Sequence, residues 1–119
     1  EFRRVLFRSP VESIQHYLHL LDKVTVMTVD PGYAGQPFIP EMLAKITQLH
    51  QLKETGSLRF LLEVDGSCNR NTYRALLDAG AQILVMGSSG LFRADMPLEL
   101  AWETMSRELS AALHSPELV

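Results

Sequence analysis

Three short loops of small and acidic residues each follow an apolar, strand-like segment, and these loops hold the residue types that can do chemistry. Residues 24–29 end at Asp30, and residues 58–64 end at Asp65. Residues 82–86 lead into a loop of glycine and serine. A carboxylate can move a proton, and backbone N–H groups can hold a phosphate where small side chains leave room. The sequence therefore predicts acid–base and phosphate-binding loops on one scaffold.

The segments around these loops have the apolar spacing of helices. Apolar side chains recur every three or four positions, with proline at three of the starts and glycine at two of the ends. Helices are expected over residues 10–23, 39–56, 69–80 and 97–113, with Asn69 as a cap. The side chains that we expect to face the core from the first and last helices are Ile14, Tyr17, Leu18, Leu21, Leu98, Ala101, Trp102, Met105 and Leu109.

Composition and charge restrict the class of protein. The chain has 119 residues, 46% of them hydrophobic, and a formal net charge of −3, which suits one domain with an apolar core. Its lysines and arginines are scattered, so there is no basic field for nucleic acid. No apolar run approaches the roughly 20 residues that span a bilayer. The lone Cys68 is compatible with a reducing compartment, and we expect a cytoplasmic protein without nucleic-acid or membrane partners.

Strands and helices alternate along the sequence. Such alternation implies parallel strands joined by right-handed crossovers, with functional groups at the carboxyl ends of the strands. We therefore expect an α/β fold with about three parallel strands and flanking helices. A portion of an eight-fold β/α barrel and a small open doubly wound binding module both fit this order. In a barrel portion, residues 24–29 and 83–86 would each lack a neighbouring strand, and the open edges would favour association.

The first nine residues stand apart from this pattern. They are short and basic, do not resemble a secretory signal, and fit no predicted element. Residues 6–9 also match what the end of a common sequencing adapter encodes in one reading frame. We therefore interpret residues 1–9 as a non-native leader and residues 10–119 as the folded domain. The alternative is an authentic strand with Val5 and Phe7 facing a core.

Three motifs in fixed order resemble the ribulose-phosphate 3-epimerase family. They are Met-Thr-Val-Asp-Pro-Gly-Tyr-Ala-Gly-Gln-Pro-Phe-Ile-Pro-Glu-Met at 27–42, Glu-Val-Asp-Gly-Ser-Cys-Asn at 63–69 and Val-Met-Gly-Ser-Ser-Gly-Leu-Phe at 85–92. The likeness extends over most of residues 10–112. It implies the carboxyl-terminal portion of a TIM (β/α)8 barrel, with strands six, seven and eight of that barrel in this chain. The His-x-Asp pair and the further histidine of the family have no counterpart in the sequence.

The same resemblance implies an isomerase that inverts C3 of a ketose phosphate through an enediolate, with two aspartates as acid and base. It makes Asp65 the catalytic proton donor and a ligand of a divalent cation, either Zn, Mn, Mg or Co, whose other ligands are missing from this chain. It also implies a homo-oligomeric intact enzyme with a sugar-phosphate substrate. The residues that it assigns to substrate or phosphate binding are Gly32, Tyr33, Ala34, Gly35, Asp65, Gly66, Ser67, Gly87, Ser88 and Ser89.

Within the family, residues 36–38 and 67–69 are more similar to enzymes of D-allulose 6-phosphate, which is converted to D-fructose 6-phosphate, than to those of D-ribulose 5-phosphate. Ribulose 5-phosphate is the alternative substrate, and a catalytically inactive phosphate-binding fragment is the alternative function. Each motif also has a purely structural interpretation. Asp30 and Asp65 can close turns, the Gly-Ser loop can be an ordinary connection, and we interpret Cys68 as a bystander thiol.

Overall fold

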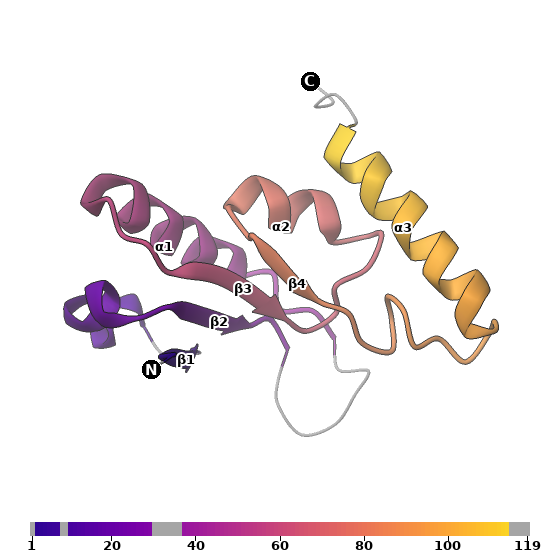
Figure 1. Ribbon diagram of the computed structural model, residues 1–119, viewed down its shortest axis with the longest axis horizontal. Helices are drawn as coiled ribbons and strands as arrows, with labels where there is room; N and C mark the ends of the chain where they lie inside the picture. Colours follow the sequence, from indigo (N-terminus) through magenta and orange to yellow (C-terminus); the bar gives the residue numbers. More distant parts are fainter. Residues whose placement is uncertain (1, 8–9, 30–36, 115–119) are drawn as a thin grey trace.

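The chain folds around one parallel sheet with four strands, and the computed structural model describes residues 2–7, 10–29 and 37–114. The strands follow the order of the sequence across the sheet, and each pairs in parallel with the next. In Figure 1 the arrows of β2, β3 and β4 lead into loops at the same end of the sheet. The strands are β1 (Arg4–Phe7), β2 (Lys23–Met27), β3 (Leu61–Asp65) and β4 (Ile83–Val85).

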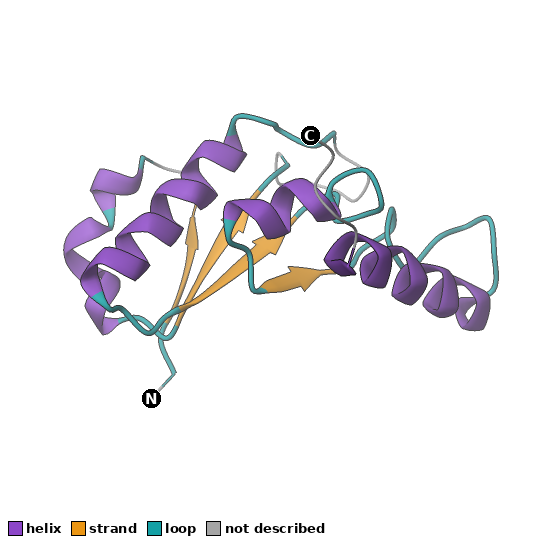
Figure 2. Ribbon diagram, turned by 90° about the horizontal axis from the view of Figure 1, so that it is seen from above, coloured by secondary structure: helices purple, strands orange, loops and turns teal. Residues whose placement is uncertain are grey.

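Helices cover one face of this sheet. Figure 2 shows α1 and α2 side by side over the strands, with α3 beyond the β4 side of the sheet and packed against α2. No described helix is long and apolar enough to cross a membrane. The helices are the 3-10 turns η1 (Val11–Ser13) and η2 (Gln15–Leu20) and the α-helices α1 (Met42–Gly56), α2 (Tyr73–Ala79) and α3 (Leu98–His114).

Local chemistry explains where the α-helices stop. After α1, Ser57 adopts a left-handed conformation with φ 51°, and the N–H of Leu58 donates to the carbonyl of Lys53 at 2.9 Å. After α2, Gly80 has φ 119°, and Ala81 N–H donates to Leu76 O at 3.0 Å. A left-handed residue at this position lets the chain satisfy the last helical carbonyls while it turns back. Both stops return the chain to the next strand.

The hydrophobic core lies between the sheet and these helices. Alternate residues of β2 and β3 point toward the helices and are fully buried, which is the pattern that parallel strands show on a covered face. Burying one such side chain contributes about 1.5–3 kcal/mol. The fully buried apolar side chains include Val11, Leu18, Val24, Val26, Ile46, Leu49, Phe60, Leu62, Val64, Tyr73, Leu76 and Ala101.

The architecture confirms the expected parallel α/β fold and chooses between its two forms. A doubly wound module has helices on both faces of its sheet, whereas α1 and α2 of this chain cover the same face and α3 lies beyond the β4 side (Figure 2). A barrel also has helices on one side of its strands only, with the other side turned inward. The arrangement is therefore that of part of a β/α barrel.

The beginning of the chain differs from the sequence-based expectation. Arg4–Phe7 forms a strand that pairs with β2, although residues 1–9 fit no predicted element. The strand has only four residues, too few for an apolar period to be recognised in the sequence. Because β1 covers β2, the prediction of an open edge at 24–29 is wrong, whereas β4 lies at an edge of the sheet. The pairing does not test the origin of residues 1–9, and the leader interpretation stays a prediction.

Two helical predictions are also wrong in detail. Residues 10–23 form two 3-10 turns in place of one α-helix, and Tyr17 is 58% exposed. In α3, Ala101 and Met105 are buried as expected, but Leu98 and Trp102 are exposed. Residues four apart share a helix face, whereas adjacent residues lie about 100° apart. Only the narrow stripe that contains Ala101 and Met105 reaches the neighbouring helix.

Candidate active site

Thr28 after β2 and the loops after β3 and β4 lie at the carboxyl edge of the sheet. Asp65 is the last residue of β3, pairs in register with Met27, and is half-buried. Register also puts Asp65 on the same side of the sheet as Glu63 and Thr25, which is the side without helices. A carboxylate there is held by the strand and open toward the space that a barrel would enclose. This position suits proton transfer to a bound substrate.

Thr28 joins the loop after β2 to the loop after β3. Its N–H donates to Asp65 O at 3.0 Å, and its hydroxyl donates to Gly66 O. Gly66 has φ 130°, and a Cβ there would lie 2.8 Å from both Thr28 Oγ1 and Val29 Cγ2. Only glycine combines this backbone conformation with such a close approach. The Asp65-Gly66 pair is therefore shaped by its packing against β2.

Ser67 continues this loop in a left-handed conformation with φ 50°. Its carbonyl accepts two hydrogen bonds, from Thr72 Oγ1 at 2.7 Å and from Asn69 Nδ2 at 3.2 Å. Left-handed backbone is uncommon for residues other than glycine, so these two donors offset the conformational cost. The loop holds its shape through side chains from the turn that leads into α2.

The loop after β4 is a short turn built around Gly87. The carbonyl of Gly87 accepts from Leu91 N–H at 3.0 Å and from Phe92 N–H at 2.9 Å. A Cβ at Gly87 would meet no atom within 4 Å, and Ser88 and Ser89 are exposed. No hydrogen bond joins the N–H groups of these two serines to other described residues. They are donors that a phosphate could use.

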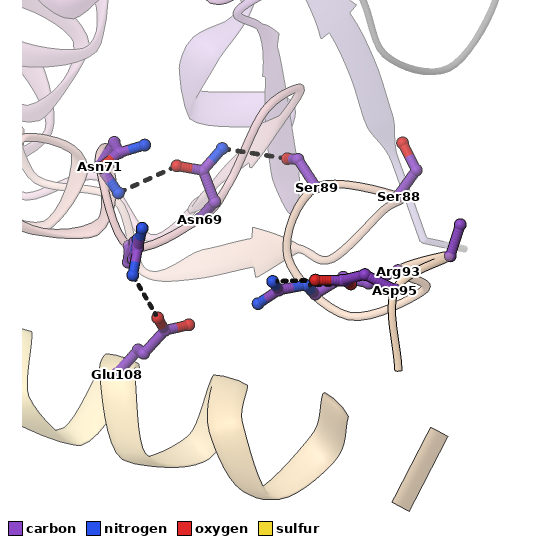
Figure 3. A pocket seen from close by; sticks show the side chains of 9 residues that line it. Asn69, Asn71, Ser88, Ser89, Arg93, Asp95 and Glu108 are labelled. Carbon is purple, nitrogen blue, oxygen red and sulfur yellow. Dashed lines mark hydrogen bonds and ion pairs between the residues drawn. The ribbon is translucent and has the colours of Figure 1, made fainter. Parts of the chain in front are cut away.

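A polar pocket of about 400 Å³ lies between the loop after β3, the loop after β4 and α3. Figure 3 shows its side chains converging from both loops, with Arg93 paired to Asp95 and a further ion pair to Glu108. The hydrogen bond from Arg93 lowers the pKa of Asp95, so this carboxylate stays ionised and occupies the guanidinium. The lining residues are Asn69, Arg70, Asn71, Ser88, Ser89, Arg93, Ala94, Asp95 and Glu108.

Cys68 lies beside the site, but its thiol is not reactive. Its side chain is buried, with Sγ 3.6 Å from the carbonyl of Val64. Burial raises the pKa of the thiol to about 11, so the thiol stays protonated at neutral pH, and only the thiolate is a nucleophile or a metal ligand. These observations support the interpretation of Cys68 as a bystander.

A buried ionic cluster on the open face has no counterpart among the sequence predictions. Glu63 accepts from Thr25 Oγ1 at 2.6 Å and from Lys23 Nζ at 3.1 Å, and Arg4 lies 4.0 Å away. Burial acts to raise the pKa of Glu63, but these hydrogen bonds and positive charges together lower it. The signal in the sequence is polar residues alternating with apolar ones in 23–25 and at position 63. This cluster lies on the same side of the sheet as Asp65.

The structure brings part of the predicted site together. Residues 65–67 and 87–89 follow neighbouring strands, and Asn69 Nδ2 bonds Ser89 Oγ at 3.0 Å between them. The predicted Gly32, Tyr33, Ala34 and Gly35, and Asp30 before them, lie outside the described residues. Within the described part of the chain, no group of three or more His, Cys, Asp or Glu side chains could hold a metal ion. Asp65 therefore does not make a metal site with the other described residues.

Comparisons with known proteins agree with this geometry. The sequence profile of the ribulose-phosphate 3 epimerase family matches residues 4–92. Three similar proteins each carry the name ribulose-phosphate 3-epimerase. The Bacillus subtilis protein is 41% identical over 88 residues, which are 73% of this chain and 41% of that protein. The Mycobacterium tuberculosis protein is 34% identical over 106 residues, 89% of this chain and 46% of that protein.

The Schizosaccharomyces pombe protein is 41% identical over 93 residues, which are 78% of this chain and 39% of that protein. The chain thus spans less than half the length of these relatives. The match is nevertheless continuous across β1 to β4 and the loops that follow them. On this match, together with the parallel sheet and its loops, the chain belongs to the ribulose-phosphate 3 epimerase family.

Proposed function

We propose that this chain is the phosphate-binding and proton-donating part of a ketose-phosphate 3-epimerase. The observation that carries the proposal is the position of Asp65, at the carboxyl end of β3 and on the face of the sheet without helices. The loop 87–89, with exposed serines and no side chain at Gly87, follows the adjacent strand. Epimerisation of a sugar phosphate requires an acid that protonates C3 and a loop that binds the phosphate, and these residues would supply both.

The reaction inverts C3 through two proton transfers on opposite faces of the sugar. A base removes the C3 proton, and its electron pair moves toward the neighbouring carbonyl to give an enediolate. A carboxylic acid on the other face then returns a proton to C3. We assign that acid to Asp65. The opposing base is a second aspartate from the part of the family's barrel that this chain does not contain.

A divalent cation, as the family implies, would stabilise the enediolate oxygens. The described residues do not fit such an ion on their own, because they contain no group of three candidate ligands. We therefore propose Asp65 as one ligand only, in a complete protein that supplies the others. The steps above involve protein groups alone.

Two sugar phosphates are candidate substrates. The motifs at 36–38 and 67–69 favour D-allulose 6-phosphate, with Ser67 where the pentose enzymes usually have a second glycine. The names of the similar proteins favour D-ribulose 5-phosphate. Ser67 keeps a backbone N–H and adds a hydroxyl, which is compatible with either phosphate. The choice rests on the sugar rather than on the phosphate group.

An epimerase assay with Zn(II) or Mn(II) tests the function on two proteins. One is the chain itself, and the other is a fusion in which the preceding part of the Bacillus subtilis relative replaces residues 1–9. We expect C3 epimerisation by the fusion only, with the preferred sugar identifying the substrate. Activity in neither protein would remove the epimerase assignment. Activity in the short chain would show that residues 1–119 are sufficient.

Replacing Asp65 with asparagine in the active fusion tests the acid. Asn has the same shape but cannot deliver a proton, so exchange of the C3 proton with heavy water should fall by about 10²–10⁴-fold. Asp78→Asn is the matched control, because Asp78 is exposed on α2 and forms an i,i+4 surface pair with Arg74. Unchanged exchange in Asp65→Asn would assign the proton transfer to another residue.

Gly87→Glu tests the phosphate loop. The new carboxylate fits sterically, since a Cβ at Gly87 meets nothing within 4 Å, but it repels a phosphate dianion. We expect the affinity of the chain for the sugar phosphate to fall at least about tenfold, or about 1.4 kcal/mol. Gly87→Ala controls for the side chain itself and should bind nearly normally. Equal binding by wild type and Gly87→Glu would place the phosphate elsewhere.

A further inference from the structure

The side chain of Asn69 connects the two loops of the proposed site. Its Nδ2 donates to Ser67 O at 3.2 Å and to Ser89 Oγ at 3.0 Å, while its Oδ1 accepts from Asn71 N–H at 2.9 Å. Figure 3 shows Asn69 between Asn71 on one side and Ser89 on the other. One amide therefore bonds the loop after β3, the turn before α2 and the loop after β4.

The backbone around Asn69 is held by further bonds. Thr72 Oγ1 accepts from Asn69 N–H at 3.0 Å and donates to Ser67 O at 2.7 Å. Ser67 O is thus the meeting point of both side chains, at the residue with left-handed φ. Asn69 cannot shift without breaking this arrangement. It offers Ser89 a donor in a fixed position.

The loop after β4 packs closely on the same segment. A Cβ at Gly90 would lie 2.3 Å from Cys68 O, so only glycine lets the two backbones come this near. The hydroxyl of Tyr73 also lies 3.4 Å from Met86 Sδ. These contacts fix the two ends of the segment 86–90. Within it, the bond from Asn69 holds the hydroxyl of Ser89, the neighbour of Ser88.

Orientation matters here because the charges of the pocket are already paired. Arg93 forms two bonds to Asp95, at 2.9 and 2.7 Å, and Arg70 lies 3.9 Å from Glu108. An anion that enters gains little from a guanidinium that a carboxylate already occupies. It depends instead on the direction of N–H and O–H dipoles, which weaken steeply when misaligned. The position of Ser88 and Ser89 then decides the affinity.

We propose that Asn69 is a positioning residue for phosphate binding, which holds loop 87–89 against loop 65–67 so that both present their polar groups to one phosphate. The inference rests on the proposed function, because it assumes that these loops bind the phosphate. Asn69 does not touch the phosphate itself. The residue type follows from the geometry: the bridge needs two donors and one acceptor on one planar group, which asparagine has and aspartate or serine lacks.

A double-mutant cycle tests the bridge in the 119-residue chain. The variants are Asn69→Ala, Ser89→Ala and the combination, and the ligands are inorganic phosphate and D-ribulose 5-phosphate, titrated by phosphorus NMR. Loss of the hydrogen bond between Asn69 and Ser89 should weaken phosphate binding about three- to tenfold in each single variant. The double variant should bind no more weakly than the weaker single variant, because both remove the same interaction.

Asn69→Ser separates this role from a local structural one. Serine can still accept from Asn71 N–H and close the turn, but it is too short to reach Ser89. We therefore expect an unfolding midpoint near that of wild type together with the same three- to tenfold loss of phosphate affinity as in Asn69→Ala. Normal phosphate affinity in Asn69→Ser, or additive losses in the double variant, would overturn the positioning role alone. Wild type that binds neither ligand would overturn it together with the phosphate assignment, while epimerisation by the fusion is judged separately.

Discussion

The two faces of the sheet differ in role, although alternate residues of the same strands form both. One face packs the apolar core that stabilises the fold, and the other carries the polar groups of the candidate site. On the helix-covered face, Val24 and Val26 are fully buried and purely apolar. On the open face, Thr25 and Glu63 are just as inaccessible, but they are polar and bonded to each other at 2.6 Å. Asp65 stands on that second face. A side-chain period of two is enough to separate a core from a site.

The difference concerns specificity as well as polarity. Apolar packing on the covered face tolerates exchange among side chains of similar volume. The open face depends on exact partners, since a buried carboxylate that loses its donors is costly. We therefore expect the covered face to respond to lost volume and the open face to lost hydrogen bonds or changed pH.

The largest effect should come from Leu62→Ala on the covered face. Leu62 is fully buried in the core, and its truncation leaves a cavity that should lower the free energy of unfolding by about 2–5 kcal/mol. Leu61→Ala is the matched control, because Leu61 precedes it on the same strand and is 41% exposed. Denaturant unfolding measures both. Equal losses would contradict the assignment of the two faces.

Gly66→Ala should have the next largest effect, at the point where β3 meets its loop. The added Cβ would lie 2.8 Å from Thr28 Oγ1 at a φ of 130°, and we expect a loss of about 1–3 kcal/mol in unfolding free energy. Gly87→Ala makes the same change where a Cβ meets nothing and should be nearly neutral. A neutral Gly66→Ala would mean that the loop is free to move away from Thr28.

Glu63→Gln should cost about 1–3 kcal/mol at neutral pH, because the amide weakens the bonds from Thr25 and Lys23. The pKa of Glu63 in the folded chain lies below its ordinary value of 4.5, since those bonds outweigh the effect of burial. The unfolded chain then takes up the proton more readily. The stabilisation is complete above pH 4.5 and is lost as pH falls through the lower, folded pKa.

Urea unfolding at pH 7 and at pH 3.5 checks this sign. Wild type should lose stability on acidification, and Glu63→Gln should lose less, so that the gap between them narrows at low pH. Glu103→Gln is the control, because Glu103 is exposed on α3. If wild type and Glu63→Gln differ in unfolding free energy by the same amount at both pH values, ionised Glu63 does not cause the pH dependence.

The expected elements were predictable where their signals are local. Residues 24–29 and 58–64 are β-branched or apolar runs that end in turn chemistry, and β2 and β3 lie within or beside them. A strand in residues 1–9 is only the alternative interpretation of the sequence, because four residues carry too little periodicity, and the stability of β1 as a strand comes from pairing with β2. Residues 10–23 contain helical spacing, but tertiary packing selects 3-10 turns there.

The sequence likewise predicts the loops of the site but not the contacts that shape them. Asp65 and the loop 87–89 follow strands, so sequence order alone puts them at one edge. The residues that shape them were not predictable, because their partners are distant in sequence: Glu63 lies 38 residues from Thr25, and Asn69 lies 20 from Ser89. Such pairs require the register of the sheet. Residues 32–35 stay a prediction.

The smallest effect should come from Trp102→Gln, although helical spacing makes Trp102 a core candidate. Its side chain is 58% exposed, next to Ala101, which is buried, so the change should cost less than about 0.5 kcal/mol. Met105→Gln, one turn along the buried stripe, should cost more because it buries an amide. Trp102 is the sole tryptophan, and its emission should shift little on unfolding, since its indole already contacts water. A large red shift would show that α3 buries the face with Trp102 in solution.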